Sequence, residues 1–85
     1  MNTYIQLIRR DNSIANIYEF FNLSPKQFLN SLYNKKHKLS DFINEVVNLV
    51  HVVELKIIYN KQNTHNIKIH RDYEKGTFQF HDSEV

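Results

Sequence analysis

The hydrophobic residues in the first half of the chain recur at the spacing of an amphipathic helix. Ile14, Ile17, Tyr18 and Phe21 follow one another at helical intervals, which predicts a helix over residues 13–21. A helix with one apolar stripe has to bury it against other elements, so this segment is expected to pack against neighbouring helices.

Three more helices are predicted around this one, over residues 3–10, 24–33 and 41–50. The signals are clearest at the start of the second of these, because Ser24 can cap its free amides and Pro25 stands where no N–H is needed. Asn22 tolerates the positive φ of a tight turn before it. Phe28 and Leu32 lie one turn apart and are expected to face the core.

The last third of the chain alternates between apolar and polar residues, which is the period of a β-strand. Apolar residues recur at every second position over residues 53–59, and the pattern returns over residues 66–71 and 77–81. Gly76, the only glycine of the chain, falls in the turn between the last two segments. Three antiparallel strands in a meander are therefore predicted.

These patterns predict an α+β fold with an N-terminal four-helix unit of the helix-turn-helix type, followed by a C-terminal antiparallel β-meander of two to three strands. Within a single compact domain of 85 residues, residues 1–51 would form the helical unit and residues 52–85 the β-region. The β-region would complete the core and form the interface of a homodimer, because a small sheet needs cover on its apolar face. The residues expected at that interface are Ile67, Ile69, Phe78 and Phe80.

The segment Leu23-Ser24-Pro25-Lys26-Gln27-Phe28, with Leu32 after it, resembles a known family. It is similar to the helix-turn-helix domains of phage and plasmid repressors, the Cro-like and lambda-repressor-like group, and Lys35 to Ser40 resemble the loop that follows the recognition helix there. The resemblance covers roughly residues 3 to 50. It implies a sequence-specific, double-stranded DNA-binding transcriptional regulator of phage or mobile-element type, with residues 24–33 in the major groove.

The residue types around this helix are consistent with DNA contact. Gln and Asn can form two hydrogen bonds with adenine, and Lys and Arg can reach phosphate oxygens. A basic loop directly follows the helix, and two arginines end the first predicted helix. The expected DNA-binding residues are Lys26, Gln27, Asn30, Tyr33, Asn34, Lys35, Lys36, Lys38, Arg9 and Arg10.

A second hypothesis assigns the chain a protein partner instead of DNA. Ile14 and Tyr18 stand where the repressor family has a phosphate-contacting Gln and an Ala, and Leu29 and Tyr33 form an apolar pair on the flank of the exposed face. The chain would then be a protein-binding inhibitor or antirepressor, for example a phage-encoded inhibitor of a host defence nuclease. A structural dimerisation domain within a larger assembly is a third reading.

Composition narrows these hypotheses only slightly. The formal charge of +2 and the pI of about 8.9 are too mild to identify a nucleic-acid partner. The chain has no cysteine, its five histidines match no familiar metal-site spacing, and no catalytic motif is present, so a non-enzyme without cofactor or metal is expected. No apolar stretch resembles a signal peptide or a membrane span, which favours a cytoplasmic location.

Overall fold

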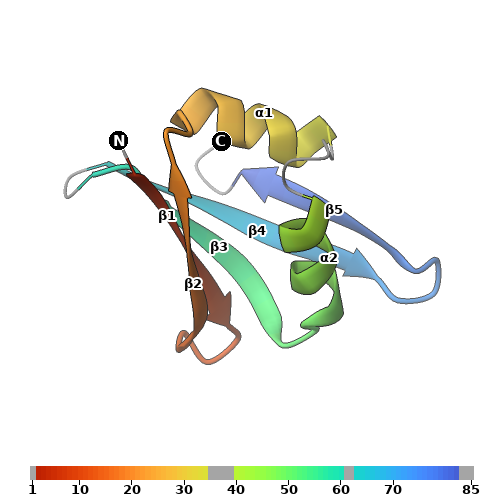
Figure 1. Cartoon of the computed structure of the whole chain (residues 1–85). Helices are drawn as coiled ribbons and strands as arrows, with labels where there is room; N and C mark the ends of the chain where they lie inside the picture. Colours follow the sequence, from red (N-terminus) through yellow and green to blue (C-terminus); the bar gives the residue numbers. More distant parts are fainter. Residues whose placement is uncertain (1, 35–39, 61–62, 83–85) are drawn as a thin grey trace.

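The computed structural model describes residues 2–34, 40–60 and 63–82. Five antiparallel strands form one sheet in the order β2-β1-β3-β4-β5, and two helices stand between β2 and β3 in the sequence (Figure 1). The elements are β1 (Asn2–Arg9), β2 (Ile14–Phe21), α1 (Pro25–Asn34), α2 (Ser40–Asn48), β3 (Val52–Ile58), β4 (Thr64–Asp72) and β5 (Thr77–Asp82).

The predicted four-helix N-terminal unit is wrong, because residues 3–10 and 13–21 lie in the antiparallel strands β1 and β2 and not in helices. In β1, Thr3, Ile5 and Leu7 are buried and the residues between them are not, which is the period of a half-buried strand. In β2, β-branched and aromatic residues predominate, and these favour strands over helices.

The other predicted elements are confirmed in outline. The expected helices over residues 24–33 and 41–50 correspond to α1 and α2, and the expected meander corresponds to β3, β4 and β5. The expected boundary between residues 51 and 52 falls inside one sheet, since β1 lies between β2 and β3.

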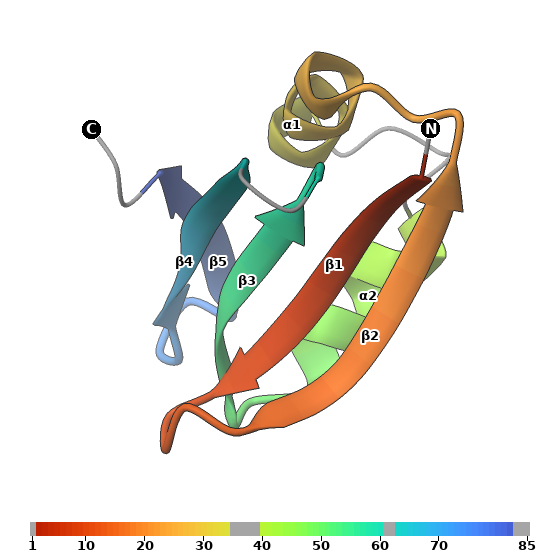
Figure 2. The same cartoon turned by 90° about the vertical axis from the view of Figure 1, so that its left-hand side faces the viewer.

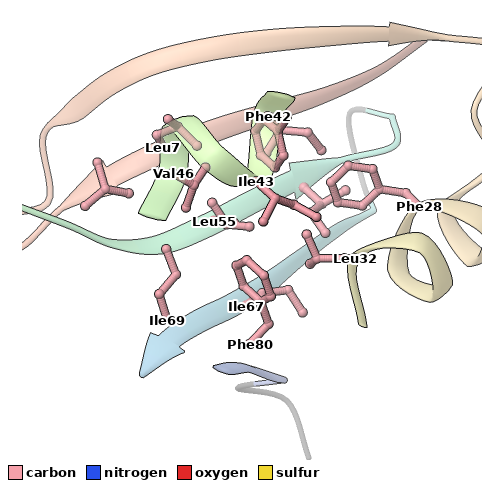
Figure 3. Packing of buried hydrophobic residues seen from close by; sticks show 13 residues of the cluster. Leu7, Phe28, Leu32, Phe42, Ile43, Val46, Leu55, Ile67, Ile69 and Phe80 are labelled. Atoms are coloured by element: carbon pink, nitrogen blue, oxygen red, sulfur yellow. The ribbon is translucent and has the colours of Figure 1, made fainter. Parts of the chain in front are cut away.

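Both helices pack on one face of the sheet, which we call the helix face, and the core lies between them and the strands (Figure 3). Phe28 and Leu32 of α1 are fully buried, as predicted, and Phe42, Ile43 and Val46 of α2 join them. The strands contribute the remaining buried apolar residues, Ile5, Leu7, Val52, Leu55, Ile57, Ile67, Ile69 and Phe80.

Aromatic rings connect β2 to both helices. The ring of Tyr18 meets Phe42 edge-on at 5.1 Å between centroids, and Phe20 lies 5.6 Å from Phe28 and 5.7 Å from Phe42. Edge-to-face pairs at these distances are favourable beyond the area they bury. The side chains on the helix face of β2 thus pack against the core, and those on its other face are exposed.

Candidate protein-interaction surface

The second face of the sheet, which we call the open face, carries neither helix. Figure 2 shows β1 and β2 in front of α2, so that α2 covers only the far side of the sheet. Residues opposite one another in neighbouring strands point to the same face, and Ile5, Tyr18 and Ile57 are opposite one another on the helix face. The residues at the alternating positions of β2, β1 and β3 therefore belong to the open face.

An apolar strip runs along this open face over β2, β1 and β3. Ile8 lies opposite Ile14, Tyr4 lies opposite Ile58, and Ile17 and Phe21 continue the strip along β2. The exposed fractions are 46% for Ile14, 51% for Ile17 and 74% for Phe21, which is high for such side chains. We define the apolar strip as Tyr4, Ile8, Ile14, Ile17, Phe21 and Ile58.

Glu19 is the one acidic residue of β2, and it points to the same face because it lies opposite Tyr4. Its carboxylate accepts a hydrogen bond from the side-chain amide of Asn2, and the Tyr4 hydroxyl lies 3.4 Å from the same oxygen. The charge is thus partly satisfied by neighbours on β1. Gln6 interrupts the strip on β1, between Tyr4 and Ile8, and Glu54 and Lys56 of β3 lie opposite Ile8 and Gln6 on the same face.

The other half of the open face, over β4 and β5, is polar. Lys68 lies opposite His81, His70 lies opposite Gln79, and the two histidine rings stack with centroids 4.1 Å apart. The side chain of Gln79 hydrogen-bonds to His81. The open face is therefore divided into an apolar half near β2 and a polar half near β5.

The turn between β1 and β2 fixes the register of the two strands and thereby decides which of their side chains lie on the open face. The Arg9 amide donates to the Ser13 carbonyl, and Asn12 takes the positive φ of 70° that the turn needs. The Asp11 carboxylate accepts hydrogen bonds from the Ser13 hydroxyl and amide, and these bonds lower the pKa of Asp11. A one-residue slip of β2 would move the strip residues of β2, Ile14, Ile17 and Phe21, to the helix face.

In the part of the chain that the structure describes, β2 is an edge strand that pairs only with β1. Natural edge strands are commonly protected by lysine, proline or a covering segment. β2 contains neither lysine nor proline, and Glu19 is its only charged residue. The apolar strip and an unprotected strand edge therefore lie side by side.

The residues expected to contact DNA are divided between distant places. Lys26, Gln27, Asn30, Tyr33 and Asn34 are exposed on α1. Arg9 and Arg10 lie beside the β1–β2 turn, at the far end of β1 from α1 (Figure 1). The structure does not bring these two groups together. Three further members of the expected set, Lys35, Lys36 and Lys38, lie outside the described residues.

The three amide side chains on α1 that were expected to read bases, those of Gln27, Asn30 and Asn34, have partners within the chain. The backbone N–H of Gln27 donates to the Ser24 hydroxyl at 3.2 Å, and the side-chain oxygen of Gln27 accepts from the backbone N–H of Ser24 at 3.3 Å. This reciprocal pair of hydrogen bonds is a capping box. The side chain of Asn34 donates to that of Asn30 at 3.1 Å. Gln27 therefore helps to begin the helix.

The expected dimer residues belong mainly to the core of the chain itself. Ile67 is fully buried and Ile69 and Phe80 are 8% exposed, so these side chains are not available to a partner, whereas Phe78 is half-buried. In the expected partner pair on α1, Leu29 packs against the core and Tyr33 is 47% exposed.

The four described histidines, His51, His65, His70 and His81, form no site with an evident chemistry. His65 and Asp82 are bonded at 2.7 Å on the helix face between β4 and β5. Nowhere in residues 2–34, 40–60 and 63–82 do three His, Asp or Glu side chains gather as metal ligands. Neither of the helices in these ranges has the length and apolar character to cross a membrane.

No protein-family model matches the chain, and neither a curated protein nor a solved structure shows significant similarity to it. Inference about function therefore rests on the surface itself.

Sequence reasoning missed the apolar strip because it placed all of its residues except Ile58 on helices. The signal that could have found it is the segment Asp11-Asn12-Ser13 between two runs rich in β-branched and aromatic residues. Such a segment is typical of a β-hairpin. Read as strands, the two runs carry apolar residues on both faces, which indicates one face for the core and one for a partner.

Proposed function

We propose that the chain is a non-enzymatic protein-binding module and that its partner covers the apolar strip on the open face. The observation that carries this proposal is the departure of that face from ordinary patterning. An antiparallel sheet with one solvated face normally alternates apolar and polar residues, whereas β1 and β2 have apolar side chains on both faces. An exposed group of large apolar side chains of this kind marks an interaction site.

The charge of the strip favours a protein over a nucleic acid. Tyr4 and Phe21 could stack on bases, but single-stranded nucleic acid also needs a positively charged groove along its backbone. Three charged residues share the open face with the strip on β2 and β3: Glu19 lies opposite Tyr4, Glu54 opposite Ile8 and Lys56 opposite Gln6. Two of the three are acidic and would repel phosphate. A protein partner with apolar side chains fits this combination better.

The free edge of β2 suggests how such a partner binds. An extended segment of the partner could pair with β2 as an additional strand, with main-chain hydrogen bonds supplying affinity. Its alternate side chains would then lie against Ile17 and Phe21 on the open face. This arrangement would cover the edge and the strip together.

The test compares two variants that add the same charge to the same face. Ile17→Lys places a cation in the strip, and His70→Lys places one on the polar half, at an exposed position of β4. A partner captured by the wild-type chain, identified and then purified is expected to bind His70→Lys normally and to lose most of its affinity for Ile17→Lys. Equal binding by both variants would contradict the proposal.

DNA binding through α1 remains a prediction, and the same protein tests it. Binding of a random-sequence duplex at about 50 mM salt, lost steeply as salt is raised, would indicate phosphate contacts. If Lys26→Ala weakened DNA binding and Ile17→Lys did not, the result would favour the hypothesis of a DNA-binding regulator over that of a protein-binding module. The expected result is that the duplex is not retained.

A further inference from the structure

The main-chain groups on the outer edge of β2 belong to residues of the open face. In an antiparallel pair, alternate residues of a strand direct their main-chain bonds to the same neighbour. The Arg9 N–H donates to the Ser13 carbonyl, so every second residue of β1 from Arg9 bonds toward β2. The residues of β2 opposite them are Asn16, Tyr18 and Phe20. The N–H and C=O groups of Ile17, Glu19 and Phe21 therefore point away from the sheet.

The part of this edge near the β1–β2 turn is already bonded within the chain. The Ile17 N–H donates to the side-chain oxygen of Asn16 at 2.8 Å, as a group directed away from β1 can. The Arg9 guanidinium donates to the Ile14 carbonyl at 3.0 Å. No such bond occupies the outward N–H groups of Glu19 and Phe21 within the described residues. An added strand would therefore pair around Glu19.

Glu19 carries a negative charge in the middle of this edge, between two apolar residues of the open face. Its exposed carboxylate receives bonds from Asn2 and Tyr4, which both lie on β1 and both bond the same oxygen, Oε1. Among the residues that the structure describes, none bonds Oε2. One carboxylate oxygen thus remains for a strand added on the other side of β2.

The helix face of the same edge also carries an acidic residue. Burial and then a hydrogen bond to the Glu45 carboxylate of α2 raise the pKa of the Tyr18 hydroxyl. β2 itself contains no lysine or arginine. Negative charge therefore flanks the edge on both faces, and a complementary partner brings positive charge to it.

We propose that the partner strand carries a lysine or arginine opposite Glu19, between two apolar residues that lie opposite Ile17 and Phe21. In an antiparallel pair this basic residue exchanges both main-chain hydrogen bonds with Glu19 and lays its side chain beside the carboxylate. The partner is thus an extended segment with apolar, basic and apolar residues at alternate positions. The inference rests on the proposed function and adds the chemistry of the partner.

Desolvation is the reason why the middle residue has to be basic. A strand that covers the edge removes water from the Glu19 carboxylate, and an apolar side chain in that place would leave the charge without compensation. Opposite charges directly across a strand pair are favourable, and like charges are unfavourable. The apolar residues on either side supply contact with Ile17 and Phe21, which are both exposed.

The test uses two synthetic peptides, Thr-Val-Thr-Lys-Thr-Val-Thr and the same peptide with a central Glu, titrated into the isotope-labelled chain and followed by NMR. The wild-type chain is expected to bind the Lys peptide about threefold or more tightly than the Glu peptide. Glu19→Gln, which keeps an oxygen for the Asn2 bond, is expected to bind the two equally. Glu19→Lys is expected to reverse the preference. Glu74→Lys, the same charge change at an exposed turn position, is expected to leave the wild-type preference unchanged.

Amide hydrogen exchange locates the bound peptide. The Lys peptide is expected to slow the exchange of the Glu19 and Phe21 amides, because these would become bonded to the added strand. The Ile17 amide is expected to change little, since Asn16 already bonds it. Protection of Gln79 in β5 in place of Glu19 would overturn the inference.

The outcomes separate this inference from the proposed function. If both peptides bound the wild-type chain equally and both lost affinity for Ile17→Lys, the basic residue would be ruled out and the apolar strip would remain a binding surface. If neither peptide bound the wild-type chain, the inference alone would fall, because the captured partner tests the proposed function separately. Equal binding to wild type and Ile17→Lys would overturn both.

Discussion

The guanidinium of Arg71 in β4 donates a hydrogen bond of 2.8 Å to the carbonyl oxygen of Val46 in α2. The same group also bonds the carbonyls of Leu49 and Val52, at the end of α2 and the start of β3. The last carbonyls of a helix lack partners within the helix and attract a positive charge. One side chain of the sheet thus caps α2 and fixes it over the helix face.

Replacement of Arg71 by Met is expected to lower the free energy of unfolding by about 3 kcal/mol, because buried carbonyls lose a charged donor. Burial lowers the pKa of Arg71, because the charged guanidinium loses contact with water. The hydrogen bonds to the three carbonyl oxygens offset this loss of hydration. Urea denaturation measures the change. The control, Arg10→Met at an exposed position, should stay within about 0.5 kcal/mol of wild type, and an equal loss in both variants would argue against the cap.

The two helices and the three C-terminal strands could be predicted from the sequence because each carries a local signal. Ser24 and Pro25 mark the start of α1, and alternation marks β3 to β5. The first two strands were missed, because Ile14, Ile17, Tyr18 and Phe21 fit a helical stripe as well as a strand with two apolar faces. The turn segment Asp11-Asn12-Ser13, through which β2 pairs with β1, was the local signal that favoured a hairpin.

The candidate site could be predicted even less well, because the contacts that form it are not local. Tyr4 and Ile58 are 54 positions apart, and only the pairing of β1 with β3 places them side by side. The sequence did identify exposed polar residues on α1, yet Gln27 serves the helix cap there. A residue type that can read DNA also has structural uses that spacing alone does not distinguish.

The capping box at the start of α1 predicts a difference between Ser24→Ala and Ser24→Asn. Loss of the Ser24 hydroxyl removes the acceptor for the Gln27 amide and should destabilise the chain by about 1 kcal/mol, whereas Asn can replace that acceptor. Chemical denaturation of the two variants checks the ranking. Equal stabilities for wild type and Ser24→Ala would show that the bond contributes nothing.

Gly76 predicts a purely conformational effect of substitution. Its φ is +65°, and a Cβ placed there would meet no atom within 4 Å. Gly76→Ala should therefore cost about 1–2 kcal/mol through the left-handed backbone alone, and Gly76→Asn less. Thermal unfolding measures both. A larger loss for Asn than for Ala would indicate a steric contact instead.

Asp11 predicts a pH dependence of the β1–β2 turn. The Ser13 hydroxyl and then the Ser13 amide hold the pKa of this carboxyl below its ordinary value. A carboxyl whose pKa is lower in the folded state stabilises the fold above its unfolded pKa, and this contribution is lost as pH falls through the folded pKa. Asp11→Ala should therefore lower the melting temperature at pH 7, and the difference from wild type should shrink below about pH 4.

The variant Ser13→Ala tests whether the Ser13 hydroxyl is the main cause of the lowered pKa of Asp11. This variant removes the hydroxyl and keeps the amide, whose bond to the Asp11 carboxylate is 2.9 Å long. The pKa of Asp11, followed by NMR through its carboxyl carbon, should rise toward the ordinary value but not reach it. A pKa unchanged by Ser13→Ala would mean that the hydroxyl is not the main cause, and the turn would then depend on the backbone bond.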